Sequence, residues 1–184
     1  IKTNNSCGTV IVVKDKNKLN RNVCKRKLNT WLKDNYGIRS GQLHYSKIVP
    51  KILIEKYLQQ DGNESTSLID YKFFCFHGIV KYILVIYNRD LNTHSFIRQF
   101  YDLNWNRIIV DDDVSENISK PKSLKRMIHI AEVLSTSLAF VRVDLYEVNS
   151  RPYFGELTFT PGFDQSIAYN KLGMGNLINI VEKE

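Results

Sequence analysis

The chain has 184 residues, of which 43% are hydrophobic, so it is long and apolar enough to fold as one domain or two small ones and is not a disordered chain. Its formal net charge of +7 is spread along the sequence, and the aromatic residues lie in apolar stretches. This pattern is not typical of nucleic-acid-binding proteins, which concentrate basic charge beside base-stacking aromatics. Binding of phosphorylated small molecules or anionic glycans explains the charge, and so does an ordinary soluble surface.

Three cysteines, Cys7, Cys24 and Cys75, show no metal-ligand spacing. Their odd number and wide separation favour a reducing, cytoplasmic setting. No apolar run approaches the length of a membrane span, and nothing resembles a signal peptide. The first residue is Ile1, already inside an apolar run, so we expect a piece of a longer protein that lacks upstream sequence.

The first segment, residues 1–14, predicts two short strands around a polar loop, with Thr9–Val13 as the second strand. A loop of small residues between strands can direct its N–H groups at a phosphate. A single glycine in a polar turn is by itself more often an ordinary turn. Residues 19–36 predict a basic helix ended by Gly37. We expect its buried stripe to consist of Val23, Leu28, Trp31 and Leu32.

The next two segments both predict strands. Residues 51–58 form an apolar run that predicts a buried strand ending in a polar hinge. From Asp70 the chain predicts a hairpin that turns at His77-Gly78 and returns through residues 79–87. Asp70 and Lys72 share one face of the first strand, where a cross-strand salt bridge is the simplest interpretation.

Residues 96–110 predict a further pair of strands. The run Asp111–Asp113 that follows predicts a solvated acidic turn rather than a metal site, because three adjacent acids cannot all face one ion. A helix is predicted over residues 124–138, with Ser123 as its cap, and residues 163–181 predict a closing loop and a last helix. We expect the buried face of the 124–138 helix to contain Leu124, Met127, Ile128, Ala131 and Leu134.

Residues 141–162 predict another β-hairpin, with a polar turn at Asn149-Ser150-Arg151 and an aromatic return strand over residues 153–159. Asp144 and Glu156 lie on either side of that turn, each inside an apolar strand. A carboxylate that water cannot reach must be paired, protonated or bound to a metal. Two carboxylates on facing strands can bind one cation, an arrangement that suits magnesium when phosphates supply its other ligands.

Arg142 shares the strand face of Asp144, so the hairpin predicts two acids and an arginine around a metal-bound polyphosphate. In a second interpretation, which remains open, Arg142 pairs with Glu156 in an exposed cross-strand ion pair that binds no ligand.

The hairpin also resembles a known family. An Asp, a hairpin and Glu-x-Asn before Pro-Gly form the magnesium-binding end of ATP-grasp enzymes such as D-alanine–D-alanine ligase, and here Thr158 replaces that Asn. The sequence is also similar to the TupA-like ATP-grasp group of cell-surface polysaccharide pathways. The similar segments are Val-Arg-Val-Asp-Leu-Tyr and, after it, Tyr-Phe-Gly-Glu-Leu-Thr-Phe-Thr-Pro-Gly. Asp-Tyr-Lys-Phe, which begins at Asp70, is also typical of that group, and the resemblance extends from Lys2 to Gly173.

The resemblance implies roles for individual residues. Asp144 and Glu156, with Thr158, would bind magnesium, while Arg142 and Lys2 would neutralise phosphate. Lys72 would lie near phosphate or substrate, and Arg89 is a candidate contact of the phosphate or acyl phosphate. The implied catalytic set is therefore Arg142, Lys72 and Arg89, and the implied metal set is Asp144, Glu156 and Thr158.

It also implies a nucleotide site. The loop over residues 3–8, with Ser6 and Gly8, matches the phosphate loop, and Glu-Lys-Tyr-Leu at residues 55–58 matches the segment that holds adenine. Glu55 and the carbonyl of Lys56 would face the adenine amino group, and the N–H of Leu58 would meet a ring nitrogen. Asp70 would bind the ribose hydroxyls. The implied nucleotide contacts are Lys2, Ser6, Gly8, Glu55, Lys56, Leu58 and Asp70.

The implied fold is α+β, an ATP-grasp fold with a small lid subdomain over residues 1–54 and a larger antiparallel-sheet subdomain over residues 55–184, without the N-terminal subdomain. The implied activity is that of a carboxylate–amine ligase that uses ATP and Mg²⁺, acts through an acyl phosphate, and joins amino acids or peptides to a cell-surface glycan precursor. A degenerate nucleotide-binding or scaffolding module of a polysaccharide assembly pathway is the alternative, and glycan transfer without ATP is a third hypothesis.

Overall fold

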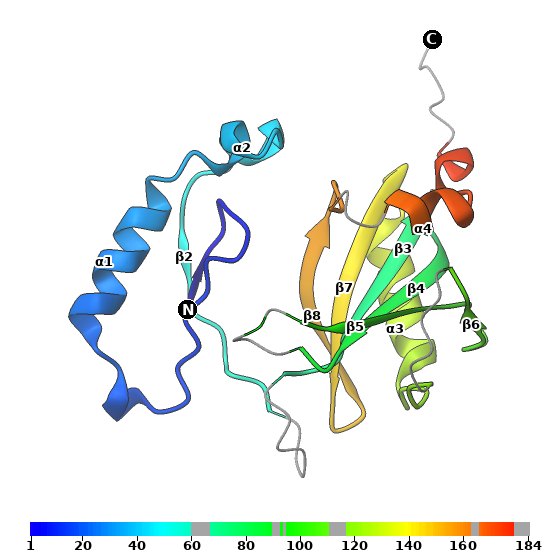
Figure 1. Ribbon diagram of the computed structural model, residues 1–184, viewed down its shortest axis with the longest axis horizontal. Coiled ribbons are helices and arrows are strands. Elements are labelled where there is room, and N and C mark those ends of the chain that lie inside the picture. Colours follow the sequence, from blue (N-terminus) through cyan, green and yellow to red (C-terminus); the bar gives the residue numbers. More distant parts are fainter. Residues whose placement is uncertain (60–66, 90–92, 94, 111–116, 163–165, 179–184) are drawn as a thin grey trace. The chain divides into compact units, whose positions relative to one another are not determined.

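The computed structural model describes residues 1–59, 67–89, 93, 95–110, 117–162 and 166–178, so the predicted acidic turn Asp111–Asp113 lies outside the described residues. The chain forms two compact units, Ile1–Leu58 and Gln59–Glu184 (Figure 1). The subdomain roles assigned to residues 1–54 and 55–184 stay predictions. No helix in the described ranges is long and apolar enough to cross a membrane.

The first unit contains one small antiparallel sheet. Strand β1 (Lys2–Thr3) pairs with β2 (Ile52–Leu53). The prediction of a strand over Thr9–Val13 is wrong, since Val10 makes only an isolated bridge with Lys2. The pairing of β1 with the distant β2 is continued by Asn4, whose side-chain oxygen accepts from the backbone N–H of Lys51 at 2.7 Å.

The prediction of a buried strand over residues 51–58 is also wrong. Only Ile52–Leu53 is a strand, and the two side chains are 43% and 38% exposed. The physical reason is that β2 contributes only two residues to a two-stranded sheet. Such a small sheet offers too little surface for other side chains to pack over it.

Helix α1 spans Arg21–Leu32 and begins at Asn20, whose side chain accepts from the N–H of Val23 at 3.1 Å. It ends four residues before the predicted end at Tyr36. A separate short helix, α2 (Tyr36–Arg39), follows, and Gly37 lies inside it. The buried residues of α1 are Cys24 and Leu28, whereas Val23, expected in the core, is exposed. Short 3-10 turns lie at Lys16–Lys18 (η1) and Leu43–Lys47 (η2).

The second unit is built on a six-stranded antiparallel sheet in the order β6-β5-β4-β3-β7-β8 (Figure 1). All the predicted hairpins of this part of the chain are present. The near-continuous apolar runs over residues 73–76 and 82–87 suit strands that are covered on both faces. The strands are β3 (Asp70–Phe76), β4 (Ile79–Tyr87), β5 (Ile97–Tyr101), β6 (Arg107–Ile108), β7 (Phe140–Val148) and β8 (Arg151–Thr158).

Two of these hairpins have two-residue turns in the left-handed region. His77 and Gly78 have φ values of 50° and 79°, and Asn149 and Ser150 have φ values of 51° and 62°. Turns of this kind match the right-handed twist of the flanking strands, so they fix the register of β3 with β4 and of β7 with β8. Both turns lie where the sequence predicts them.

Helix α3 (Leu124–Ser135) covers one face of the sheet (Figure 1). Leu124, Met127 and Ala131 are buried against side chains that include Phe73 and Val143. Three details differ from the prediction, the first being that the helix ends at Ser135 and not at residue 138. The hydroxyl of Ser123, at the start of the helix, donates to Glu147 at 2.6 Å instead of capping the helix, and Leu134 is 40% exposed.

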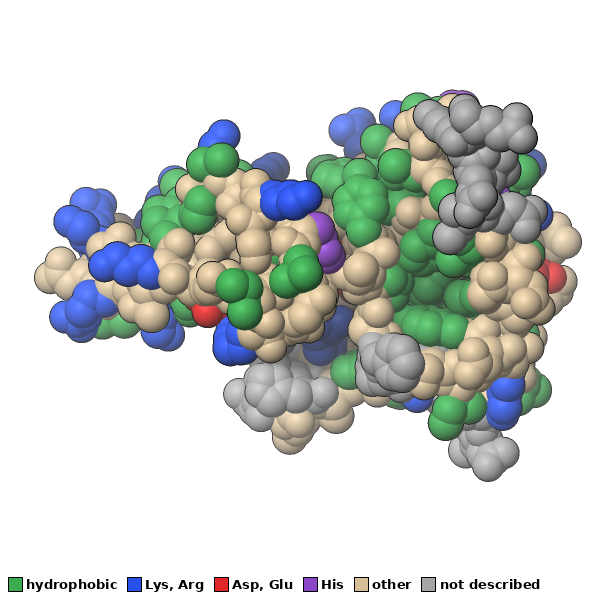
Figure 2. Space-filling view, turned by 90° about the horizontal axis from the view of Figure 1, so that it is seen from above, with side chains coloured by type: hydrophobic (Ala, Val, Ile, Leu, Met, Phe, Trp, Pro, Cys, Tyr) green, Lys and Arg blue, Asp and Glu red, His purple; other side chains and the backbone are tan. Residues whose placement is uncertain are grey.

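The opposite face carries a second hydrophobic cluster, which contains Phe74, Phe76, Leu84 and Phe100. Helix α4 (Ser166–Lys171) and the 3-10 turn η4 (Met174–Leu177) pack on this cluster through Ala168 and Met174. Figure 2 shows green hydrophobic side chains gathered in a hollow of this unit. Four of the residues predicted for the site, Asp70, Lys72, Arg142 and Asp144, lie on the same sheet face, beyond this cluster along β3 and β7.

Candidate functional site

Three charged residues form a row across three neighbouring strands. Lys72 on β3 is the register partner of Asp144 on β7, and Asp144 is the register partner of Glu156 on β8. Register partners project from the same face of a sheet, so the three side chains come together. The alternation of apolar and charged residues in β7 puts Val143 in the core and leaves Asp144 on this face.

An irregularity in β7 and β8 lies beside this row. The register shifts between Asp144 and Leu145, and Gly155 lies opposite this point. A Cβ on Gly155 would come within 3.0 Å of the backbone oxygen of Asp144 and of Cε2 of Tyr146. The close approach of the two backbones therefore requires glycine next to the two carboxylates.

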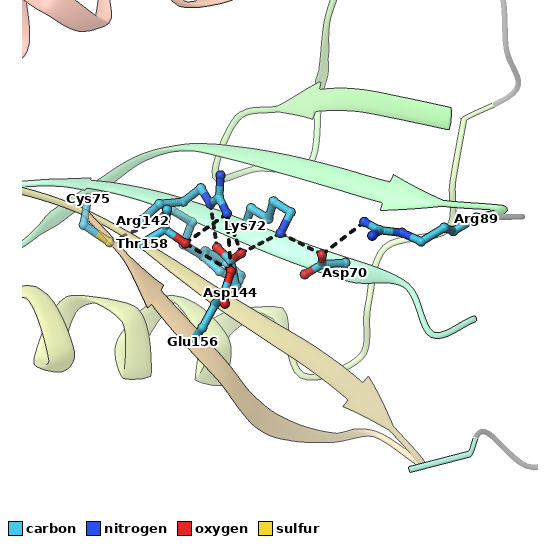
Figure 3. Close-up of polar contacts among 9 residues, drawn as sticks. Asp70, Lys72, Cys75, Arg89, Arg142, Asp144, Glu156 and Thr158 are labelled. Carbon is cyan, nitrogen blue, oxygen red and sulfur yellow. Dashed lines mark hydrogen bonds and ion pairs between the residues drawn. The ribbon is translucent and has the colours of Figure 1, made fainter. Parts of the chain in front are cut away.

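Lys72 lies between two carboxylates, and Figure 3 shows the resulting chain of ion pairs. Its Nζ donates to Oδ2 of Asp144 at 2.5 Å and is 2.7 Å from Oδ2 of Asp70. Arg89 Nη2 is 3.8 Å from the same Asp70 oxygen. Lys72 therefore forms the expected cross-strand salt bridge with Asp144, the predicted metal ligand on β7, and it also pairs with Asp70 within its own strand.

Arg142 donates two hydrogen bonds to Asp144. Its Nε donates to Oδ1 and its Nη2 to Oδ2, both at 2.7 Å, and Nη2 also donates to the hydroxyl of Thr158 at 3.0 Å. The distance from Nη2 to Oε1 of Glu156 is 3.8 Å. The alternative of an exposed Arg142–Glu156 pair is therefore a minor contact, and the main partner of Arg142 is the buried Asp144.

Burial makes these charges interact strongly. Asp144 is 1% exposed, Arg142 8% and Asp70 7%, whereas the side chain of Glu156 is 61% exposed. Burial, with the nearby charge of Asp144, raises the pKa of Asp70, although Lys72 and Arg89 oppose the shift. Burial works against the charged guanidinium of Arg142, but its hydrogen bonds to Asp144 outweigh that effect and raise its pKa.

Asp70 is incompletely satisfied. Its Oδ1 is buried and has no hydrogen-bond partner within the described part of the chain. A buried acceptor without a partner is costly, and such atoms often lie where a ligand binds. This observation is compatible with the prediction that Asp70 meets a hydroxyl donor.

Tyr146 belongs to the same face but was not singled out in the sequence. It is the register partner of Asp70, and burial, then the charges of Asp70, Asp144 and Glu156, raise the pKa of its phenol. Its spacing in the sequence could have identified it, because Arg142, Asp144 and Tyr146 occupy alternate positions of one strand.

Cys75 lies on the other face of the sheet, where burial raises the pKa of its thiol to about 11. The thiol therefore stays protonated near neutral pH and is no nucleophile there.

The predicted nucleotide contacts of residues 2–58 all lie in the first unit. Lys2 Nζ is 2.9 Å from Oε1 of Glu55, so these two predicted contacts form an ion pair. In the polar loop, the hydroxyls of Thr3, Ser6 and Thr9 are linked, with 2.8 Å between Ser6 and Thr9. Gly8 has a φ of 75° and open space around the position of a Cβ.

Lys56 and Leu58 follow the short strand β2 in a segment without regular structure. Lys56 is exposed and Leu58 half-buried. Their assignment to adenine rests on backbone groups and stays a prediction.

The described residues contain no group of three or more His, Cys, Asp or Glu side chains that could hold a metal ion. Asp144 and Glu156 supply only two carboxylates. Magnesium, however, is commonly bound in proteins by one or two carboxylates together with substrate phosphates. The pair is therefore sufficient for a phosphate-bound cation, although not for a cage made by the protein alone.

The model of the family described as TupA-like ATPgrasp matches residues 1–172. A solved structure, D-alanine–D-alanine ligase from Bacillus anthracis, is similar with a TM-score of 0.43 and 16% sequence identity. The similarity covers 79% of this chain and 47% of that one, so the chain spans about half the length of that ligase. No curated protein matches the sequence.

Proposed function

Because this chain belongs to the TupA-like ATP-grasp family and has the ATP-grasp fold, we propose that it is the nucleotide-binding part of an ATP-dependent carboxylate–amine ligase. In this reaction ATP phosphorylates a carboxylate, and an amine then attacks the acyl phosphate to form an amide. One observation carries the proposal. The buried Asp144 and the exposed Glu156 are register partners, beside two cations, Lys72 and Arg142.

The donor set of this pair fits magnesium. Within the described residues, Oδ1 of Asp144 accepts one hydrogen bond, from Arg142, and therefore keeps a second lone pair. Among the same residues, Glu156 accepts a hydrogen bond only from the hydroxyl of Thr158, at 3.2 Å, and its side chain is open to solvent. Hard oxygen donors of this kind are those that magnesium prefers. When bound, Mg²⁺ would neutralise charge on the nucleotide phosphates, held by Asp144 and Glu156 with Thr158 beside them.

The cations of the site have a separate role. Lys72 and Arg142 are held by carboxylates at 2.5–2.7 Å, so their charges are fixed in place before any ligand binds. Preorganised positive charge stabilises the charge that develops on a transferring phosphoryl group. Arg89, which is 45% exposed, is free enough to contact the phosphate or acyl phosphate. A protein nucleophile is not required, since positioning and charge neutralisation suffice.

We assign the remaining nucleotide contacts as the family pattern implies. Lys2, Ser6 and Gly8 would contact phosphate, Glu55, Lys56 and Leu58 the adenine, and Asp70 the ribose hydroxyls. The unpartnered Oδ1 of Asp70 supports the last assignment, because a hydroxyl group would supply its missing donor.

The wider role follows from the family rather than from the site. We place the reaction in the cytoplasm, where ATP is available, and in the biosynthesis of cell-surface polysaccharides, with an amino acid or peptide joined to a glycan precursor. A second function, a nucleotide-binding module without ligase activity, is favoured by one observation. Both oxygens of Asp144 already accept hydrogen bonds from Arg142, and Lys72 occupies Oδ2 as well.

Release of ADP separates these two functions. The chain is incubated with ATP, Mg²⁺ and panels of amino acids and sugar acids, and ADP is measured with and without each panel. A ligase releases ADP only when Mg²⁺ and a suitable acid are present. ATP binding without ADP release under any panel would support the binding module. If UDP-glucose binds and ATP does not, the proposal of a ligase fails.

A further inference from the structure

An open cavity of about 460 Å³ lies in the second unit. Its lining residues are Arg126 of α3 and Arg151, Pro152 and Tyr153 at the start of β8. None of them contributes to the ion pairs around Lys72 and Asp144. Glu156 and Thr158, the site residues of β8, lie toward the other end of that strand.

The two arginines of this cavity have no polar partner in the described residues. The side chains of Arg126 and Arg151 form no ion pair or hydrogen bond with another described residue, and both are exposed. An arginine without an acidic partner retains its full capacity for a bidentate contact with an anion. Three further exposed cations add positive charge: Lys120 and Lys122, which precede α3, and Lys125 in its first turn.

Short hydrogen bonds and strand pairing hold the backbone around the cavity. Glu147 accepts hydrogen bonds from both the backbone N–H and the hydroxyl of Ser123, each at 2.6 Å, and so fixes the start of α3 to β7. Arg151 follows the tight turn Asn149-Ser150 directly and is the register partner of Val148. The backbones that carry Arg126 and Arg151 are therefore held in place before a ligand binds, which lowers the entropic cost of binding.

We propose that this cavity is a binding site for a small organic oxyanion, a phosphate monoester or a carboxylate carried on a compact ring. The volume lies within the range of small-molecule sites, about 300–1,000 Å³. Two guanidinium groups select planar or tetrahedral oxyanions. Pro152 and the ring of Tyr153, which is 36% exposed, offer an apolar wall to the body of the ligand. This site does not depend on the proposed ligase activity.

The test uses isothermal titration of the full chain at low salt with three probes: glucose 1-phosphate, glucuronate and uncharged glucose. The variants are Arg126→Ala, Arg151→Ala and Arg126→Lys. The matched control is Lys125→Ala, which removes one exposed charge from the same helix but does not line the cavity. All three positions are exposed, so the four variants should fold, and circular dichroism checks that they do.

We expect a charged probe to bind and glucose not to bind. Each arginine-to-alanine change should weaken binding about 10- to 100-fold, the loss expected for a hydrogen bond to a charged group. Arg126→Lys should recover only part of this loss, and Lys125→Ala should change affinity less than about twofold. Tighter binding of glucose 1-phosphate than of glucuronate would identify the ligand as a phosphate, and the reverse order as a carboxylate. Equal losses for Lys125→Ala and Arg126→Ala, or no binding of either charged probe, would overturn the proposal.

Discussion

Lys72 is the side chain on which the electrostatics of the candidate site depend. It contacts Asp70 and Asp144 at 2.7 and 2.5 Å, and both carboxylates are almost fully buried. Two buried anions on neighbouring strands repel each other unless a cation lies between them. Lys72 therefore has two roles, since it neutralises buried acids in the folded chain and is proposed to face phosphate in the complex.

Replacement of Lys72 with Met should lower the free energy of unfolding by about 3 kcal/mol, because it leaves a buried carboxylate without its cation. Arg142 still faces Asp144, so the loss should come mainly from Asp70. Urea unfolding measures this loss in the free energy of unfolding. The double variant Lys72→Met with Asp70→Asn should recover most of the loss. A loss below about 1 kcal/mol, the contribution of an exposed ion pair, would contradict the account.

The raised pKa of Asp70 predicts a dependence of stability on pH. Burial raises this pKa above the unfolded value of 3.8, so the folded chain holds the proton more tightly than the unfolded chain. The stability that Asp70 contributes is therefore fully present below pH 3.8 and is lost as the pH rises through the folded-state pKa.

The comparison with Asp70→Asn isolates this effect, because the asparagine does not titrate. The free energy of unfolding of the original chain minus that of the variant should fall as the pH is raised from about 3.5 to about 7.5. Urea unfolding at a series of pH values gives this difference. A difference that rises with pH would indicate a lowered pKa and would contradict the structure.

At the scale of elements, the hairpin of β7 and β8 brings the acids together. Its register is fixed by the turn at Asn149-Ser150 and is adjusted by the shift between Asp144 and Leu145. Such an irregularity in an edge strand re-aims the side chains next to it, and here these are the proposed metal ligands. Gly155 permits the close approach that this geometry requires.

The variant Gly155→Ala should therefore destabilise the chain by about 1–3 kcal/mol, because the added Cβ would approach the backbone oxygen of Asp144 to 3.0 Å, a tighter contact than normal packing allows. Thermal unfolding measures the effect. Gly175→Ala is the matched control, since a Cβ there meets no atom within 4 Å. Equal melting temperatures for the two variants would show that the hairpin tolerates a side chain at residue 155.

The local sequence was sufficient to predict the hairpins of the second unit, because alternation and turn residues are local signals. It failed in the first unit for two reasons. Strand β1 pairs with β2, about fifty residues away, and no local pattern reports such a partner. Gly37 was interpreted as a helix terminator, although a Cβ there would approach the N of Ser46 to 2.7 Å, so packing requires the glycine.

At the scale of the whole molecule, the sequence predicted the members of the candidate site but not their partners. The parity of Arg142 and Asp144 predicted one shared face. That Lys72 lies opposite Asp144 depends on the order β3-β7-β8, which only the folded sheet defines. The unpaired arginines of the α3–β8 cavity were missed for the same reason, since 25 positions separate Arg126 from Arg151 in the sequence.

The central claim is that Asp144 and Glu156 hold the magnesium of a bound nucleotide. Isothermal titration of the full chain with ATP, with and without Mg²⁺, tests it in the original chain, in Glu156→Gln and in the control Glu132→Gln. Glu156 is largely exposed, so its substitution should leave the fold intact. Glu132, which accepts from the N–H of Val80, lies outside the site.

We predict that Mg²⁺ strengthens ATP binding in the original chain and in Glu132→Gln, and that Glu156→Gln loses about 10- to 100-fold of that magnesium-dependent affinity. An ATP affinity that is the same with and without Mg²⁺, or a magnesium effect that Glu156→Gln leaves unchanged, would contradict the claim.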